Sequence, residues 1–88
     1  MLFHPLKSRL AFRLLVLIEV LGGREGSSGR LETPMSQSDF AKMINGSRQQ
    51  VNKVFRQWDD EGIVHFVNGQ YHVPSIERLV LEARSTDP

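Results

Sequence analysis

The 88-residue sequence contains no cysteine, and this absence excludes several kinds of chemistry. Disulfides, thiolate metal sites and cysteine nucleophiles are all ruled out, and the composition suits a reducing compartment. An excess of charge of one sign is also missing, since 11 lysines and arginines against 10 aspartates and glutamates leave a net charge of +1. A net charge this small neither indicates nor excludes a nucleic-acid partner, so the distribution of the charges decides.

Long apolar runs are lacking as well. The leucine-rich residues 1–21 are interrupted by Arg13 and Glu19, and their longest unbroken apolar piece runs from Leu14 to Ile18. This is far short of the roughly 20 apolar residues that span a bilayer, and no small-residue cleavage site of a signal peptide follows. We therefore expect a soluble, cytoplasmic protein with no membrane partner, folded as a single domain over residues 1–88.

The first element that the sequence predicts is a helix. Apolar residues recur at helical spacing over residues 6–21, and two glycines end the pattern. Because the apolar surface is wider than one stripe, we expect a central core helix, with the alternative that part of it faces another subunit or domain. The polar, glycine-rich residues 22–30 predict a flexible loop. Residues 31–33 predict a short strand, which Pro34 confines to an edge or an end.

Two helix starts follow close together. Ser36, with Asp39 three residues later, resembles a capping box and predicts a short helix, which an Asn-Gly pair ends. Ser47 with Gln50 resembles a second capping box and opens a longer helix that a glycine ends. The apolar stripe of this longer helix consists of Val51, Val54, Phe55 and Trp58.

After the longer helix the apolar period changes from helical spacing to alternation. Residues 63–67 and 70–73 flank Asn68-Gly69, a strong signal for a two-residue hairpin turn that pairs His65 with His72. The side chains expected on the core face of this hairpin are Val64, Phe66, Tyr71 and Val73. A short final helix is expected after Pro74, with its inward side formed by Ile76, Leu79, Val80 and Ala83.

The order of these elements predicts the fold. A short helix, a turn of about three residues with a glycine, and a longer helix form a helix-turn-helix over residues 36–61. The hairpin at residues 63–73 follows directly and is its wing. We therefore predict an α+β, mainly helical, winged helix-turn-helix domain with a C-terminal β-hairpin wing and a short final helix.

The exposed side of the longer helix carries the candidate functional residues, all of them hydrogen-bond donors without negative charge: Arg48, Gln49, Asn52, Lys53 and Arg56. Arginine can bridge O6 and N7 of guanine, while glutamine and asparagine can bridge N6 and N7 of adenine. We predict that DNA bases are read by Arg48, Gln49, Asn52 and Lys53. We predict that DNA phosphates are bound by Ser36, Gln37, Lys42, Ser47 and Arg56.

Other interpretations of these residues stay open. A polar strip also occurs on an ordinary solvated helix, and a winged helix can serve protein contacts without DNA. An enzyme is not predicted, because no paired-carboxylate pattern, glycine-rich phosphate loop, nucleophile elbow or metal-ligand cluster is present. His65 and His72 form an exposed pair, and two histidines without a third ligand make a poor zinc site. No metal or cofactor is predicted for this chain.

The sequence also resembles a known family, the DNA-binding domain of Crp/Fnr-type transcription regulators. The resemblance is carried by residues 35–41, 44–54, Trp58, 61–63 and the wing, and its most specific part is Ser47-Arg48-x-x-Val51-x-Lys53. It implies that Arg48, Gln49 and Lys53 read bases and that Ser47 holds a phosphate. It also implies double-stranded DNA as a partner, a homodimer in the full-length regulator, and RNA polymerase as a further partner.

Two positions depart from the usual pattern of this family. Glutamic acid is common where Gln49 stands, and a carboxylate accepts from cytosine N4, whereas glutamine favours adenine. Arginine often stands at the position of Lys53, and lysine lacks the planar fork of a guanidinium. The operator of the family's best-known members is therefore not expected to transfer. Because members usually carry a sensor domain and a dimerisation helix before this region, we interpret the chain as the C-terminal part of a longer regulator or a stand-alone variant.

Overall fold

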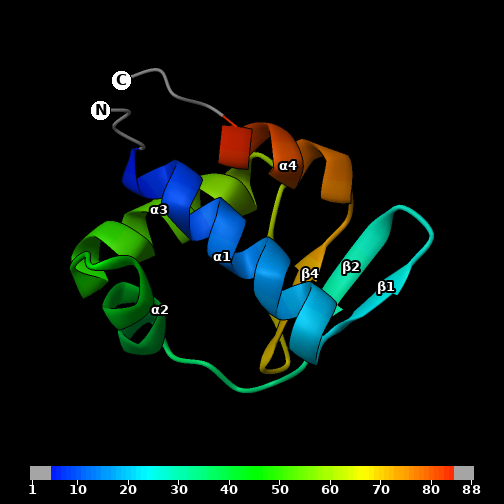
Figure 1. Cartoon of the computed structure of the whole chain (residues 1–88), viewed down its shortest axis with the longest axis horizontal. Coiled ribbons are helices and arrows are strands. Elements are labelled where there is room, and N and C mark those ends of the chain that lie inside the picture. The colour runs from blue at the N-terminus through cyan, green and yellow to red at the C-terminus, as the bar shows by residue number, and fades with distance from the viewer. Residues whose placement is uncertain (1–4, 85–88) are drawn as a thin grey trace.

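The computed structural model describes residues 5–84, in which helix α1 (Leu6–Leu21) crosses the middle of the molecule (Figure 1). Helices α2 (Gln37–Ile44) and α3 (Arg48–Asp60) lie towards one end, and α4 (Ile76–Arg84) packs along α1. The strands are β1 (Gly23–Glu25), β2 (Ser28–Leu31), β3 (His65–Val67) and β4 (Gln70–Val73). They form one antiparallel sheet in the order β1-β2-β4-β3. The predicted fold class, an α+β winged helix-turn-helix, is confirmed.

Helix α1 has the predicted bounds and supplies the centre of the core. Leu10 and Leu14 are fully buried, and the helix contacts all three other helices of the described chain as well as β1 and β2. Its opposite side leaves Phe12 61% exposed and Val20 71% exposed. The described residues therefore cover only part of the apolar surface of this helix.

Both predicted capping boxes are confirmed. The Ser36 hydroxyl accepts from the Asp39 backbone N–H at 3.0 Å, and the Ser36 N–H donates to the Asp39 carboxylate at 2.9 Å. At the start of α3 the Ser47 hydroxyl accepts from the Gln50 N–H at 3.1 Å, and the Ser47 N–H donates to Gln50 Oε1 at 2.9 Å. Asn45, between the two helices, has the left-handed conformation that its residue type tolerates (φ 57°).

A cluster of aromatic rings joins the helices to the sheet. The Phe40 ring centroid lies 5.4 Å from those of Phe55 and Tyr71, and Phe55 and Trp58 are 5.7 Å apart, all in edge-on geometry. The polar atoms of the cluster are satisfied, because Tyr71 Oη donates to the Met35 carbonyl and Trp58 Nε1 donates to a carboxylate on α4, each at 2.9 Å. Burial raises the pKa of the Tyr71 hydroxyl.

The prediction of a flexible loop at residues 22–30 was wrong. Strands β1 and β2 form a hairpin there, and the strand expected at residues 31–33 instead ends at Leu31. The hairpin is ordered by a long-range partner, since β2 pairs with β4 and brings Leu31 opposite Tyr71. Gly29 leaves room for α4 to pack on β2, because a Cβ at that position would lie 2.6 Å from the Ile76 side chain.

The wing has the predicted register, with His65 opposite His72 and Phe66 opposite Tyr71. Asn68 and Gly69 both have positive φ (53° and 78°), as a type I′ turn requires. The placement of Phe66 in the core was wrong: this side chain is 59% exposed. Its strand β3 is an edge strand of the sheet, and the ring contacts Tyr71 (centroids 4.7 Å apart) and borders a hollow beside α3, but most of it stays exposed.

The final helix is confirmed. Ile76 and Leu79 are buried, while Val80 and Ala83 are partly buried and pack against the core.

Gly22→Ala should lower the free energy of unfolding by about 1–3 kcal/mol, because the added Cβ would collide with the backbone carbonyl oxygen of Arg30. Urea unfolding followed by the fluorescence of Trp58, the single tryptophan, measures this loss. Gly23→Ala is the matched control: a Cβ there meets nothing within 4 Å, so its effect should stay within about 0.5 kcal/mol. Equal effects at both positions would show that the Arg30 contact does not select glycine.

Candidate nucleic-acid interface

Helix α3 divides cleanly into a buried and an exposed side. Val51 and Trp58 are fully buried, Val54 and Phe55 are 9% exposed, and all four point into the core as predicted. At 3.6 residues per turn, the side chains between them are turned outward. The exposed side chains of α3 include Arg48, Gln49, Lys53 and Arg56. We call these four residues, with the partly buried Asn52, the donor strip.

Within the part of the chain that the structure describes, the side chains of Arg48, Gln49, Lys53 and Arg56 make no hydrogen bond or ion pair with another residue. The nearest acid along the helix, Asp59, is engaged elsewhere: its carboxylate lies 2.6 Å from His65 Nδ1 of the wing. The donors of the strip therefore face solvent with their hydrogen-bonding capacity unused.

Asn52 is the exception in the strip. Its side-chain Nδ2 donates to Gln37 Oε1 at 3.1 Å, across the contact between α3 and the start of α2. This bond uses one Nδ2–H of Asn52 and leaves its second Nδ2–H, its Oδ1 acceptor and the Gln37 Nε2 donors for other partners. It also fixes where the beginning of α2 lies relative to the middle of α3.

The residues predicted to bind phosphate lie on two helices. Ser36 and Ser47 are caps at the starts of α2 and α3, and Lys42 and Arg56 are exposed side chains on those helices, whereas Gln37 is partly buried. The bond from the Ser36 backbone N–H holds the pKa of the Asp39 carboxyl below its ordinary value, so this carboxylate stays ionised beside the cap.

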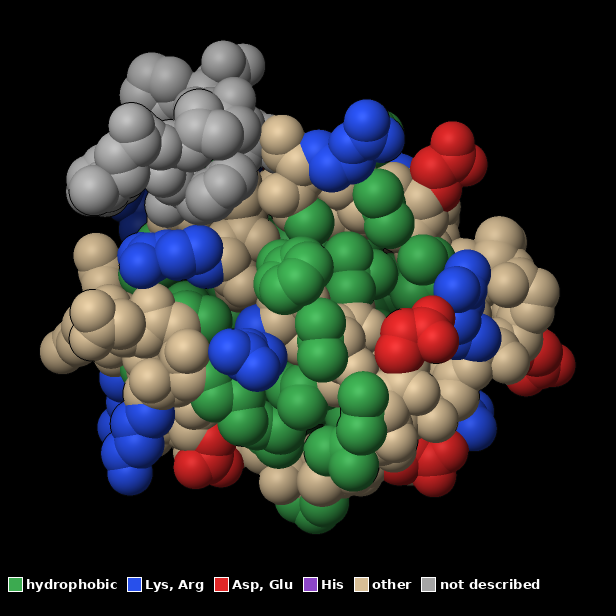
Figure 2. Space-filling view, viewed as in Figure 1, with side chains coloured by type: hydrophobic (Ala, Val, Ile, Leu, Met, Phe, Trp, Pro, Cys, Tyr) green, Lys and Arg blue, Asp and Glu red, His purple; other side chains and the backbone are tan. Residues whose placement is uncertain are grey.

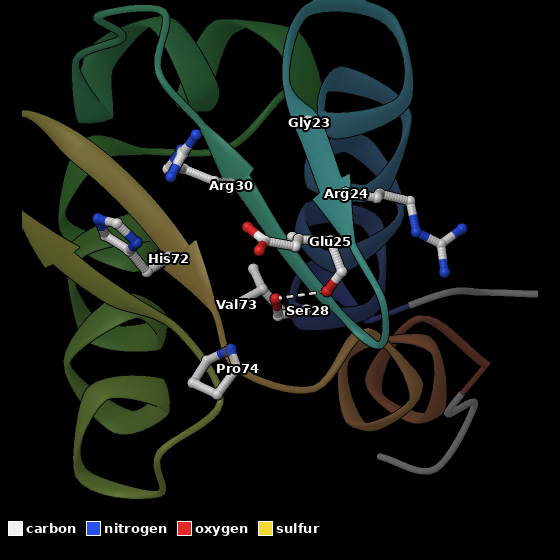
Figure 3. Close-up of a pocket in the computed structure, with 9 residues that line it drawn as sticks. Gly23, Arg24, Glu25, Ser28, Arg30, His72, Val73 and Pro74 are labelled. Atoms are coloured by element: carbon white, nitrogen blue, oxygen red, sulfur yellow. Dashed lines mark hydrogen bonds between the residues drawn. The ribbon is translucent and has the colours of Figure 1, made fainter.

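Sequence reasoning missed one basic residue near the wing. Arg30 of β2 lies directly across from His72 of β4, and the two side chains stand on the same face of the sheet, above a hollow of about 310 Å³ (Figure 3). Arg30 is paired with Glu32 at 2.9 Å. The sequence carries little signal for this strand, because Leu31 is the one apolar residue in Ser28–Leu31 and the residues before it are typical of a loop.

Two further findings concern residues 5–84 only. No three histidine, aspartate or glutamate side chains gather there in a way that could hold a metal ion. None of the helices in this part has the length and apolar character needed to cross a bilayer.

A capped pair of helices joined by a left-handed turn, followed at once by an antiparallel hairpin, defines this chain as a winged helix-turn-helix domain. Residues 8–81 match the family described as the Crp-like helix-turn-helix domain. Because the match covers most of the chain, the chain belongs to this family.

Relatives of known description agree with this assignment. The chain is 27% identical over 84 residues to the CRP-like cAMP-activated global transcriptional regulator of Mycobacterium tuberculosis, covering 96% of this chain and 38% of that protein. It is 26% identical, with a TM-score of 0.80, to the CRP/FNR-family transcriptional regulator TTHA1359 of Thermus thermophilus, covering 96% of this chain and 43% of that one. A CooA structure from Carboxydothermus hydrogenoformans shares the fold, with a TM-score of 0.80 at 22% identity, over 92% of this chain and 38% of that one.

The predicted resemblance to Crp/Fnr-type regulators is confirmed, and the relatives are transcription regulators rather than enzymes. Family membership supports DNA binding by the chain as part of such a regulator. The chain spans 38% of the length of the Mycobacterium tuberculosis relative.

Asp39→Asn should destabilise the domain near neutral pH and should have little effect in acid. The pKa of Asp39 is lower in the folded chain than its ordinary value of 3.8, so its stabilising effect is fully present above that value. The effect is lost as the pH falls from there through the folded pKa. Urea unfolding of both proteins between pH 7 and pH 2 would show the two curves converging in acid. A difference that stays constant with pH would mean that the carboxylate charge is not what stabilises the cap.

Proposed function

We propose that this chain binds duplex DNA sequence-specifically, as the DNA-binding domain of a Crp/Fnr-type transcription regulator, with α3 inserted in the major groove. The observation that carries the proposal is the donor strip, which faces away from the core with its basic side chains unpaired among the described residues. A helix is about 10–12 Å wide, and the major groove of B-DNA is about 12 Å wide. The 13 residues of α3 span about 20 Å of groove at 1.5 Å per residue.

Base reading falls to the first two turns of α3, which meet the base edges when a recognition helix enters the groove. Arg48, at the first helical position, presents a guanidinium fork suited to O6 and N7 of guanine. Gln49 suits adenine, and Lys53 donates as a point charge one turn later. Asn52 contributes through Oδ1, which accepts from an exocyclic amino group, and through the Nδ2–H that Gln37 does not use.

Phosphate contacts would hold the helix in register. The free backbone N–H groups and the dipole at the start of α3, with Ser47 there, suit one phosphate. Arg56 lies further along the exposed side of α3. On α2, Ser36, Gln37 and Lys42 would meet the backbone of the flanking strand.

The working form of the regulator is proposed to be a homodimer on a two-fold-related site, with half-sites about one helical turn (roughly 34 Å) apart. RNA polymerase is proposed as a further partner, and a cytoplasmic location follows if the ligand is DNA. The supporting observation is that the chain belongs to the same family as transcription regulators. Selection from random duplexes with the full-length regulator should return an inverted repeat with this spacing, whereas single half-sites would contradict the dimer.

Arg48→Ala should cost about 1–3 kcal/mol of binding free energy and relax the preference at one base position. The measurement is fluorescence anisotropy on the selected duplex and on its single-base variants. Arg24→Ala is the matched control, because Arg24 lies on β1 and is paired with Glu19 at 2.9 Å. If Arg48→Ala bound every duplex as the unchanged chain does, docking through the start of α3 would be wrong.

Arg56→Gln should weaken binding to all duplexes about equally and reduce the slope of log K against log salt by about 0.9, since one phosphate contact is lost. Titrations at several salt concentrations measure this slope, with Arg24→Gln as the control that should leave it unchanged. Duplex binding that does not depend on salt would instead favour a winged helix used for protein contacts.

A further inference from the structure

We propose that the outer face of α1 is a docking site for an acidic amphipathic helix of a partner protein. This inference does not depend on DNA binding. It rests on an apolar groove, on an apolar stripe that continues the groove along α1, and on the charges at its rim.

The groove lies where α1, the end of α2 and α4 meet, and its volume is about 550 Å³. Its lining includes Arg9, Phe12 and Arg13 of α1, together with Met43, Asn45 and Ala83. Two of its large apolar side chains are open to solvent, since Phe12 is 61% exposed and Met43 is 41% exposed. Exposed apolar side chains that gather around one hollow, with polar residues at the rim, mark interaction surfaces.

The apolar surface continues from the groove along α1. Phe12, Val16 and Val20 are spaced four residues apart and therefore lie on one side of the helix. Val20 is 71% exposed and Val16 is partly exposed. Figure 2 shows hydrophobic side chains gathering over the middle of the face that α1 crosses, with charged side chains of both signs around them. From Arg9 to Val20 this face is about 16 Å long at 1.5 Å per residue, which matches about three turns of a helix laid along it.

The charges at the rim indicate the sign of the partner. Arg9 and Arg13 flank Phe12, and neither side chain makes an ion pair or hydrogen bond with another residue among positions 5–84. No residue that lines the groove is acidic. The nearest acid further along the outer side of α1, Glu19, is already paired with Arg24 at 2.9 Å. A helix with an apolar stripe flanked by carboxylates would fill the hollow and neutralise both arginines.

An acidic helix suits this face better than DNA does. Phosphates could contact Arg9 and Arg13 but would leave the apolar floor of the groove uncovered, whereas an apolar stripe would fill it. The two surfaces also point in different directions, because the buried sides of α1 and α3 share one core and each exposed side faces away from it.

The test uses the 15N-labelled 88-residue chain and a synthetic helical peptide of about 16 residues, long enough for the three turns of this face. The peptide carries leucines at helical spacing, flanked by glutamates. Anisotropy of the labelled peptide gives the affinity, and NMR chemical shifts, which should cluster at Phe12, Arg13 and Met43, locate the contact. The double variant Phe12→Ala with Met43→Ala should weaken binding about tenfold or more, because the apolar contact is lost. Both positions are exposed, and thermal unfolding by circular dichroism checks that the variant is folded.

Charge reversal provides the sharper test. The double variant Arg9→Glu with Arg13→Glu should bind the glutamate peptide more weakly than the unchanged chain does. It should bind a version with lysine in place of glutamate more tightly. Leu81→Ala is the apolar control, since Leu81 is 61% exposed but lies on the other side of α4 from Ala83. Arg30→Glu is the charge control, because Arg30 is exposed on β2 between the buried Gly29 and Leu31 and so points away from α1. Neither control should change the affinity.

Several outcomes would overturn the proposal. One is equal affinity of the unchanged chain for the glutamate and lysine peptides. Another is a set of NMR chemical-shift changes that lies away from α1. A third is self-association of the chain that Phe12→Ala abolishes, since a second copy would then cover this face. Competition between the peptide and a bound duplex would also contradict it. Peptide binding is measured without DNA, so failure of the proposed DNA function leaves this test intact.

Discussion

Burial of one side of α3 determines what the chain presents to a ligand. Val51 and Trp58 are fully buried against the core that α1 supplies, and Trp58 is also fixed by its hydrogen bond to Glu82 of α4. A helix rotates about 100° per residue, so fixing these two side chains fixes the direction of every other one. Arg48 and Lys53 are directed outward for this reason, and no interaction of their own is needed to hold them there.

The second constraint sets the angle between α2 and α3. The turn between them is short, contains Asn45 in the left-handed conformation, and is followed by the Ser47 cap. A cap of this kind contributes about 1 kcal/mol, and a hydrogen bond such as Gln37–Asn52 contributes about 0.5–1.5 kcal/mol. Each of these contributions is modest, but both stabilise the same arrangement of α2 against α3. The two helices are therefore arranged before any ligand arrives, which lowers the ordering entropy lost on binding.

Most of the fold and the candidate site could be predicted from sequence because their signals are local. Capping boxes, the Asn68-Gly69 turn and the stripe of α3 each depend on residues a few positions apart, and the structure confirms them. The strand β2 could not be predicted in the same way, because its order comes from pairing with β4, which lies some forty residues later in the sequence. For Phe66, alternation predicts the face of the strand, but how much of that face is covered depends on the tertiary placement of this edge strand, which alternation does not report. The Gln37–Asn52 hydrogen bond likewise could not be predicted from the sequence, because it depends on the angle between α2 and α3.

The near-zero net charge of the chain comes from nearly equal numbers of basic and acidic side chains, 11 and 10, which are unevenly distributed. The first turns of α3 carry only basic and neutral polar side chains on their exposed side, and the acids begin at Asp59, at the end of the helix where the dipole disfavours them. The wing contacts that end through His65, whose ring nitrogen lies 2.6 Å from the Asp59 carboxylate. A phosphate-rich ligand is thus attracted to one end of α3 and repelled from the other. This gradient orients the helix with its N-terminus towards the ligand, which a uniformly basic helix of higher net charge would not do.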